Sequence, residues 1–317
     1  MSEVITIYDQ EKLLKLVQVA KRYYLEDQKQ SDIAAELGVS RPLISRMLSE
    51  ARKLGVVEII IHSPGEKQEA LLERLCKISS VSAGILVANG EDDKSTNQLL
   101  SKSTFQLLDE IQAKRIGVGW GHFIGQMVSY LEETSLPDNS VEHICPLVGN
   151  AGFPIRFYHS SENVRVLADG LRAEPYFLYL PALAESYEEK QVLCSTELYR
   201  QVEQQWARMD TALVNIGNFP STPDFASVAR YGNLLQRQHA CGRLLAYFYN
   251  EQGQIIQSDH DFAIQIPLET LKKCRNIVGL CSANTNVHAL RGALNTGIFT
   301  HIVACEILIE EFLNVEK

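Results

Sequence analysis

The sequence predicts an α/β protein with a small N-terminal helix-turn-helix domain and a larger C-terminal domain built on a mostly parallel sheet. Three observations predict this fold class. The first part of the chain places apolar residues at helical spacing on either side of a glycine turn. Beyond residue 80, strand-like apolar runs alternate with amphipathic helical segments. The length of 317 residues also fits two domains, at roughly 100–200 residues each.

Two helices are expected before the glycine turn. The first covers Lys12–Glu26, where apolar side chains recur at helical spacing: Leu13, Leu16, Val17, Ala20, Tyr23 and Tyr24. The second covers Ser31–Leu37 and is capped by Ser31. Gly38 ends it, because glycine adopts a left-handed turn at little cost.

A third helix is expected from its cap, Ser40, to about Leu54, and Gly55 ends it. Pro42 stands near its first turn, where a missing N–H is harmless. The β-branched run Val56–Ile61 then predicts a short strand or wing, and Ser63-Pro64-Gly65 marks the domain boundary. We therefore predict three parts: a helix-turn-helix domain over 1–62, a linking segment over 63–80 with a helix at Glu66–Lys77, and an α/β domain over 81–317.

The C-terminal part alternates strands and helices, which predicts a mostly parallel sheet flanked by helices. The expected strands are Ala83–Val87, Arg115–Val118, Glu142–Pro146, Tyr176–Tyr179, Thr211–Ile216, Asn276–Leu280 and Gly297–Ala304. The expected helices are Gln98–Gln112, Phe123–Leu131, Ser161–Leu171, Thr196–Met209 and Thr285–Leu294.

Composition excludes several classes of protein. No apolar run approaches the ~20 residues needed to cross a bilayer, and residues 1–10 lack the pattern of a signal peptide. Seven scattered cysteines without a CxxC pair indicate reduced thiols in a cytoplasmic protein, with no zinc site. The net charge is −9, but residues 1–62 carry nine basic and nine acidic residues, so the excess of acid lies in the rest of the chain. A small basic surface on an acidic body fits a DNA-binding protein with a ligand-binding domain.

The segment Gln30–Met47 carries the strongest functional signal. Ile33, Leu37, Ile44 and Met47 lie at core spacings, Ala34 is small where two helices would cross, and Val39 is expected to fill the space beneath the turn. Two helices joined in this way form the helix-turn-helix unit, whose second helix fits the DNA major groove. The residues expected to contact DNA bases or phosphates are Gln30, Ser31, Ser40, Arg41, Leu43, Ser45, Arg46, Ser49, Arg52 and Lys53. Ser31 and the amides of residues 31–33 are expected to hold a phosphate.

Two plainer interpretations of the N-terminal segment stay open. One is an ordinary three-helix unit with solvated arginines. The other concerns the pair Tyr23-Tyr24. These rings could be mistaken for a surface on which bases stack, but we expect them to pack between helices.

The turn after the strand Arg115–Val118 is the first candidate ligand site. It holds Gly119, Trp120, Gly121 and His122, and glycines allow backbone N–H groups to approach an anion at the start of a helix. Such crevices lie at the carboxyl ends of parallel strands. The second candidate follows the strand Asn276–Leu280 and comprises Ser282, Ala283, Asn284, Thr285, Asn286 and His288; Gly149-Asn150 forms a third wall. A plain strand-to-helix turn is the competing interpretation.

The residues Ala20–Ile59, "AKRYYLEDQKQSDIAAELGVSRPLISRMLSEARKLGVVEI", resemble the N-terminal segment of the SorC family of sugar-responsive regulators, also called the SorC/DeoR type. The resemblance continues through shorter pieces: "RIGVGWG" (115–121), "PLVGN" (146–150), "VRVLADGL" (164–171), "YLPAL" (179–183), "DTALVNIG" (210–217), "YFYNEQGQII" (247–256) and "NIVGLCSANTNVHALRGALNTGIF" (276–299). It implies a Rossmann-like C-terminal domain similar to phosphosugar isomerases. It also implies a sugar or sugar-phosphate effector and a tetramer, a dimer of dimers, whose hold on operator DNA changes with the effector.

This chain departs from the family where the effector phosphate is usually held. Phe123 occupies the usual Thr position, Asn286 the usual Lys position, and Arg243 the position of a common carboxylate. The usual Gly-Gly is Ser282-Ala283, and the usual Thr-Asp-Glu is Ala304-Cys305-Glu306. If Arg243 points into the crevice, an anion can still bind there through its forked guanidinium. We therefore expect an altered effector, either a differently shaped phosphorylated or carboxylated metabolite or a neutral sugar; a site that no longer binds anything is the other possibility.

Two competing functions remain. An isomerase or deaminase with an appended DNA-binding module needs a general base, for which His122, His288 and Glu306 are the candidates, but no spacing pairs them. The large acidic domain with its glycine loops argues against a constitutive DNA-architectural protein, because bending DNA does not require such a domain. We expect no enzymatic activity, no cofactor, no metal and no membrane partner; the expected partners are double-stranded operator DNA, a small-molecule effector and further copies of the chain.

Overall fold

The computed structural model divides into two compact units, residues Met1–Pro64 and Gly65–Lys317. It describes residues 2–57, 65–134, 136, 139–152, 156–221 and 230–315. Most of the predicted strand Val56–Ile61, together with Ser63 and Pro64, lies outside the described residues. In the described part of the chain no helix is long and apolar enough to cross a membrane.

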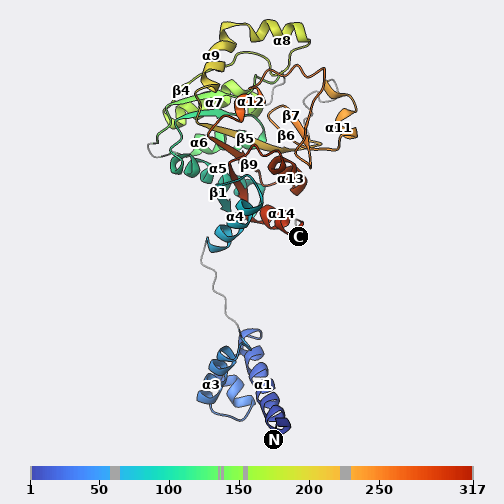
Figure 1. Ribbon diagram of the computed structural model, residues 1–317. Helices are drawn as coiled ribbons and strands as arrows, with labels where there is room; N and C mark the ends of the chain where they lie inside the picture. Colours follow the sequence, from blue (N-terminus) through green and yellow to red (C-terminus); the bar gives the residue numbers. More distant parts are fainter. Residues whose placement is uncertain are drawn as a thin grey trace. The chain divides into compact units, whose positions relative to one another are not determined.

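The first unit is a bundle of three helices, α1 (Ser2–Tyr24), α2 (Gln30–Glu36) and α3 (Arg41–Lys53) (Figure 1). Its core contains Leu16, Val19, Ala20, Ile33, Ala34, Ile44, Leu48 and Ala51. Leu37, Met47, Tyr23 and Tyr24 pack against this core, so the tyrosine pair serves helix packing. Gly38 has φ +64° in the turn between α2 and α3, the left-handed conformation that favours glycine.

Two predicted details of this unit are wrong, and a third, the cap at Ser40, is confirmed in position only. The N-cap of α2 is Lys29, so Ser31 lies inside the helix and does not cap it. Ser40 stands at the N-cap of α3 but makes no capping hydrogen bond through its side chain. Val39 is 36% exposed and lies outside the apolar core of the bundle, so it does not fill the space beneath the turn.

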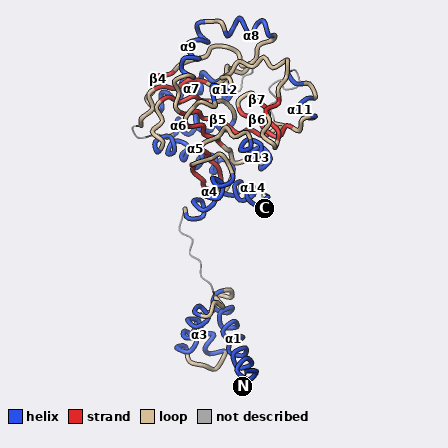
Figure 2. The backbone as a smooth tube through the Cα atoms, viewed as in Figure 1, coloured by secondary structure: helices blue, strands red, loops and turns tan. Residues whose placement is uncertain are grey.

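The second unit is built on a parallel sheet with helices on both faces (Figure 2). The strand order is β1 (Ala83–Val87), β10 (His301–Cys305), β9 (Asn276–Leu280), β5 (Thr211–Asn218), β2 (Arg115–Val118), β3 (His143–Pro146) and β4 (Glu174–Pro175). Three strands, β1, β2 and β9, coincide with the predicted ranges. The mixed α/β fold with a parallel sheet is therefore confirmed.

Helices cover each face of the sheet with a separate apolar layer. On one face, α5 (Asp93–Glu110), α6 (His122–Glu133) and α7 (Ser160–Leu171) pack on Leu213, Val278 and Val303. On the other face, the alternate residues of the same strands pack against a second layer of helices. This layer is formed by α4 (Glu66–Ile78), α9 (Glu197–Trp206), α12 (Leu268–Leu271), α13 (Val287–Asn295) and α14 (Glu306–Val315). The remaining described helices are short: η1 (Arg156–Tyr158), α8 (Tyr187–Cys194) and α11 (Leu234–Arg237).

Two features of the sheet differ from the prediction. Tyr176–Tyr179 is not a strand; after the amide of Tyr176 donates to the carbonyl of Ile144 at 2.8 Å, the chain leaves the sheet and buries Leu178 in a loop. An antiparallel extension was not predicted: β6 (Ala240–Leu244) pairs with the end of β5, β7 (Tyr247–Asn250) with β6, and β8 (Ile255–Ile256) with β7. β5 pairs with β2 as far as Leu213 and with β6 from Ile216 onward. The antiparallel extension therefore borders the carboxyl edge of the parallel sheet.

Helix α4, the first element of the second unit, packs within that unit. Leu71 and Leu75 are buried in its core, against β1 and α14. The sequence leaves open whether this apolar face packs between subunits, and Ile78 at its end is 54% exposed.

Candidate DNA-binding face and effector crevice

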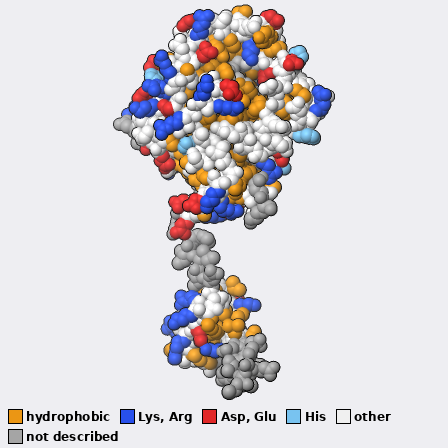
Figure 3. All heavy atoms as spheres, viewed as in Figure 1, with side chains coloured by type: hydrophobic (Ala, Val, Ile, Leu, Met, Phe, Trp, Pro, Cys, Tyr) orange, Lys and Arg blue, Asp and Glu red, His pale blue; other side chains and the backbone are white. Residues whose placement is uncertain are grey.

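Helix α3 has one apolar and one polar side. Ile44, Leu48 and Ala51 are buried, whereas the opposite side exposes Arg41, Leu43, Ser45, Arg46, Arg52 and Lys53, with Ser49 half-buried. Figure 3 shows Lys and Arg side chains gathered along one side of this unit. The expected DNA-contacting residues of α3 thus lie on a single accessible surface.

The cations of this surface keep their charge unpaired within the described chain. Glu50, the acidic residue of α3, lies with its Oε1 2.5 Å from Nζ of Lys12 on α1. No ion pair or hydrogen bond between described residues holds the side chains of Arg41, Arg46, Arg52 or Lys53. Such side chains can rotate freely to meet phosphates or base edges.

The start of α2 has fewer free hydrogen-bond donors for a phosphate than the sequence predicts. The amides of Asp32 and Ile33 donate to the carbonyl of Lys29 at 3.0 and 3.1 Å, so these two amides are already used. Ser31 is exposed, and its hydroxyl lies 3.0 Å from Oδ1 of Asp32. Gln30, the first residue of α2, is half-buried. Because that hydroxyl already donates to Asp32, the amide of Ser31 is the predicted phosphate donor that remains here among the described residues.

The predicted effector site lies at the carboxyl edge of the sheet, where the turns after β2 and β9 approach β5. The amide of Gly119 donates to the carbonyl of Leu213 at 2.9 Å, which holds the turn after β2 against β5. Gly121 has φ +120° and stands at the N-cap of α6, so no side-chain cap occupies the first amides of that helix. His122 is exposed at this helix start.

Asn215, which was not predicted from the sequence, is the most informative polar residue of this edge. Its Nδ2 lies 3.2 Å from where a Cβ on Gly121 would stand. Its Oδ1 is buried and has no hydrogen-bond partner among the described residues. Because a buried acceptor without a partner is costly, a ligand hydroxyl or amine that donates to Oδ1 would stabilise the site. A polar residue within the buried strand "DTALVNIG" was the signal available in the sequence.

Arg243 lies at the same edge. It pairs with Gly217 across β6 and β5, and a Cβ on Gly217 would stand 3.1 Å from Cγ of Arg243, so the glycine lets the arginine lie across the strand. The guanidinium hydrogen-bonds to Tyr158. The ring of Tyr158 packs edge-to-face against that of Trp120, with the ring centroids 5.8 Å apart. Burial raises the pKa of Tyr158, and the charge of Arg243 opposes that rise. The arginine therefore lies beside the turn that follows β2.

Three residues that were predicted to contact the effector cannot do so through their side chains. Phe123 is fully buried in the layer between the sheet and α6, because the second position of α6 faces the sheet. Trp120 is 5% exposed and donates from Nε1 to the carbonyl of Leu245 at 3.2 Å, so it supports the turn from behind. Asn150 donates from Nδ2 to the carbonyl of Leu178 at 2.9 Å and accepts from the amide of Ser161 at 3.0 Å, which fully occupies its side-chain amide.

Gly149 also has a structural role. It is buried, and a Cβ there would stand 2.4 Å from the carbonyl oxygen of Pro181. The glycine is required by the close approach of two loops, and the predicted third wall of the crevice is thus a packing contact.

The loop after β9 is held by its own hydrogen bonds. Ser282 donates from Oγ to Oδ1 of Asn284 at 2.6 Å, and the amide of Ala283 donates to Oδ1 of Asn97 on α5 at 2.8 Å. Oδ1 of Asn286 caps α13 by accepting from the amide of Ala289 at 2.8 Å. Of these, Asn284 and Asn286 are exposed and Ala283 is half-buried, so all three remain accessible.

His288 and Asn286, both predicted to contact the effector, line one pocket of about 550 Å³ together with Glu251, Phe219 and His239. The Nδ1 of His288 pairs with Glu251. Glu306 is held by Lys67 and Gln68 of α4. The three bases considered for an enzyme, His122, His288 and Glu306, are thus in different surroundings. Among the described residues no cluster of three metal-binding side chains occurs.

Residues 66–314 match the family described as "Putative sugar-binding domain". The chain is 26% identical over 291 residues to the sorbitol operon regulator of Klebsiella pneumoniae, covering 88% of this chain and 91% of that protein. It is 24% identical over 307 residues to the deoxyribonucleoside regulator of Bacillus subtilis, covering 93% and 95%. The crystal structure of the full-length sorbitol operon regulator SorC from Klebsiella pneumoniae superposes with a TM-score of 0.71 at 22% identity, over 96% of this chain and 99% of that one.

Proposed function

Since this chain belongs to the family of sugar-binding domains and its resemblance to SorC-type regulators is confirmed, we propose that it is a DNA-binding transcription regulator of a carbohydrate or related metabolite operon. In this proposal α3 of the first unit reads the operator, and the crevice at the carboxyl edge of the second unit binds the effector. The observation that carries the proposal is α3, whose cations are exposed and unpaired among the described residues while its apolar side is fixed on α1 and α2.

The effector we propose is an anionic or hydroxyl-rich metabolite. The start of α6 supplies amides, Arg243 a cation and Asn215 an acceptor without a partner among the described residues. An arginine supplies two parallel donors to a phosphate or carboxylate, which compensates for the lysine replaced by Asn286. The family's usual phosphate contact is thereby replaced by a contact from β6.

We further propose that α4 transmits effector binding to the DNA-binding unit. Nζ of Lys67 lies 3.0 Å from Glu306 and 2.9 Å from Glu310, and Nε2 of Gln68 lies 2.6 Å from Glu306. Glu306 directly follows β10, at the carboxyl edge of the sheet to which the crevice belongs. A displacement of this edge would therefore move the start of α4, next to the residues that join the two units. An effector changes operator binding only by its different affinity for the two arrangements of an oligomer.

Selection of bound duplexes from a random DNA pool by the full chain tests the proposal. We expect one enriched sequence with two half-sites separated by about one helical turn or a multiple of it. Fluorescence anisotropy on that duplex at fixed salt, with a panel of sugars, sugar phosphates and sugar acids, then identifies the effector by its change of affinity. Enrichment of no sequence above random duplex would contradict the DNA-binding role. A selected operator without any responding metabolite would contradict the effector role alone.

A further inference from the structure

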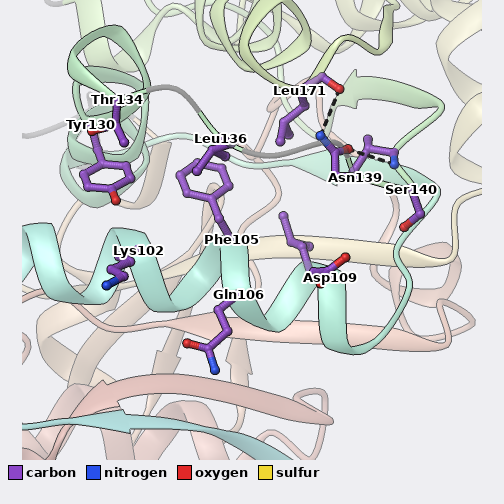
Figure 4. A pocket seen from close by; sticks show the side chains of 12 residues that line it. Lys102, Phe105, Gln106, Asp109, Tyr130, Thr134, Leu136, Asn139, Ser140 and Leu171 are labelled. Carbon is purple, nitrogen blue, oxygen red and sulfur yellow. Dashed lines mark hydrogen bonds between the residues drawn. The ribbon is translucent and has the colours of Figure 1, made fainter.

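A cavity lies at the opposite edge of the sheet from the proposed effector site. It measures about 400 Å³ and opens between the C-terminal halves of α5 and α6 (Figure 4). Ser140 and Val141, which line it, immediately precede β3, so the cavity lies at the amino edge of the sheet. It is therefore separate from the site at the carboxyl edge.

The walls of this cavity are apolar. The rings of Phe105 and Tyr130 are stacked with centroids 6.1 Å apart, and Leu108, Val141 and Leu171 also line the cavity. A cavity of this size, in the range of about 300–1,000 Å³ typical of small-molecule sites, leaves apolar surface in contact with water. Burial of that surface by an apolar ligand is favourable.

Several polar side chains line the cavity, and Gln106 among them donates from Nε2 to Oε1 of Glu110 at 2.8 Å. Asn139 donates to the carbonyl of Leu171 at 3.2 Å and Ser140 to the carbonyl of Ala113 at 3.0 Å, so both belong to the fold. The side chains of Lys102 and Asp109 have no ion pair or hydrogen bond with any described residue. They stand on α5 seven residues apart, about 10 Å along the helix axis. Figure 4 shows Lys102 and the Tyr130 hydroxyl toward one end of the cavity and Asp109 toward the other.

We propose that this cavity binds a small amphipathic monocarboxylate, such as a medium-chain fatty acid. The carboxylate accepts hydrogen bonds from Nζ of Lys102 and the hydroxyl of Tyr130, and the apolar body lies along Phe105 and Leu108. Asp109 at the far end repels a second carboxylate, which makes the site selective for monoacids. This site is independent of the operator and effector sites proposed above.

Calorimetric titration of the full chain with decanoate below its micelle concentration tests the proposal, with decanol and decanedioate as reference ligands. We expect decanoate to bind more tightly than either. Lys102→Met removes one charge-assisted hydrogen bond and is expected to weaken decanoate about tenfold or more while leaving decanol unchanged. Asp109→Asn is expected to improve binding of decanedioate. Lys94→Met, at an exposed lysine on the same helix outside the cavity, is the matched control and should change nothing.

A second variant keeps the test decisive. Thr134→Trp fills the cavity from the end of α6 and should abolish decanoate binding without changing the melting temperature of the ligand-free protein by more than a few degrees. The proposal is overturned if decanoate does not bind, or if Lys102→Met binds it as tightly as the unmodified protein. It is also overturned if Thr134→Trp lowers the mass of the assembly in sedimentation, because the cavity would then be covered by a second copy of the chain. None of these results affects the proposed role in transcription.

Discussion

Replacement of Asn215 by leucine is expected to raise the stability of the ligand-free protein and to lower its affinity for the effector. Oδ1 of Asn215 is buried in the middle of β5 without a hydrogen-bond partner among the described residues. Leucine has a similar size and removes both the unsatisfied acceptor and the group that a ligand would contact. Stability and binding should therefore change in opposite directions.

The magnitude follows from the cost of an unsatisfied buried polar group, about 1–3 kcal/mol. Since leucine must still fit beside Gly121, we expect a net gain of about 1–2 kcal/mol in the free energy of unfolding. For a domain the size of the second unit, each kcal/mol raises the melting temperature by about 2–4 °C. The loss of one hydrogen bond to an effector should weaken binding by roughly fivefold or more.

Differential scanning calorimetry of the full chain, with and without the effector found by anisotropy, measures both effects. Asn276→Leu is the matched control, because Nδ2 of this buried asparagine donates to Oγ1 of Thr211 at 3.3 Å and its loss should destabilise the protein. If Asn215→Leu lowers the melting temperature as Asn276→Leu does, Asn215 is satisfied in the ligand-free protein and the reasoning is refuted.

Two further predictions concern stability. Asp261→Asn leaves the buried Arg230 without its ion-pair partner and should lower the free energy of unfolding in urea by about 3–5 kcal/mol. Glu269→Gln, in the exposed pair with Lys272, should lower it by less than about 1 kcal/mol. Equal losses of stability would argue that burial is not the cause. Burial raises the pKa of Cys145 to about 12 and that of Cys241 to about 11. The folded protein keeps these protons where an unfolded thiol, with its pKa near 9, loses them, so stability is complete below about pH 9 and declines as the pH rises toward 11–12. Urea unfolding under reducing conditions at about pH 8 and pH 10 checks this, and no decline would show that the thiols are not buried.

Much of the fold could be predicted because its strands are buried on both faces. Such strands appear in a sequence as short, continuous apolar runs, and β1, β2 and β9 were located to the residue. The run Tyr176–Tyr179 has the same composition, but its apolar side chains pack a loop against the core. The β6–β8 extension was missed because β8 has two residues and the pairing of β6 with β7 is bulged. The turn between them is Leu245-Ala246, which lacks the glycine or asparagine that marks a two-residue hairpin in a sequence.

The candidate site was predictable only in part. The position of the glycine turn after β2 follows from the sequence, because strand, glycines and helix are contiguous there. The orientation of each side chain does not follow from it, so Phe123 and Asn150 were placed in the crevice although the fold buries one and fully bonds the other. Arg243 and Asn215 come together only through the pairing of β5 with β6, a contact between segments far apart in the chain.

Reading of bases by the exposed side of α3 underlies the proposed function. Arg46→Ala on the selected operator, measured by anisotropy at fixed salt beside a random duplex, tests it most directly, with Lys15→Ala on α1 as the control for loss of one exposed cation. A two-point contact with a base is worth about 1–3 kcal/mol, so we expect operator affinity to fall about 5- to 150-fold and random-duplex affinity much less. An equal loss on both duplexes, or a loss no larger than that of Lys15→Ala, would contradict base reading by this helix.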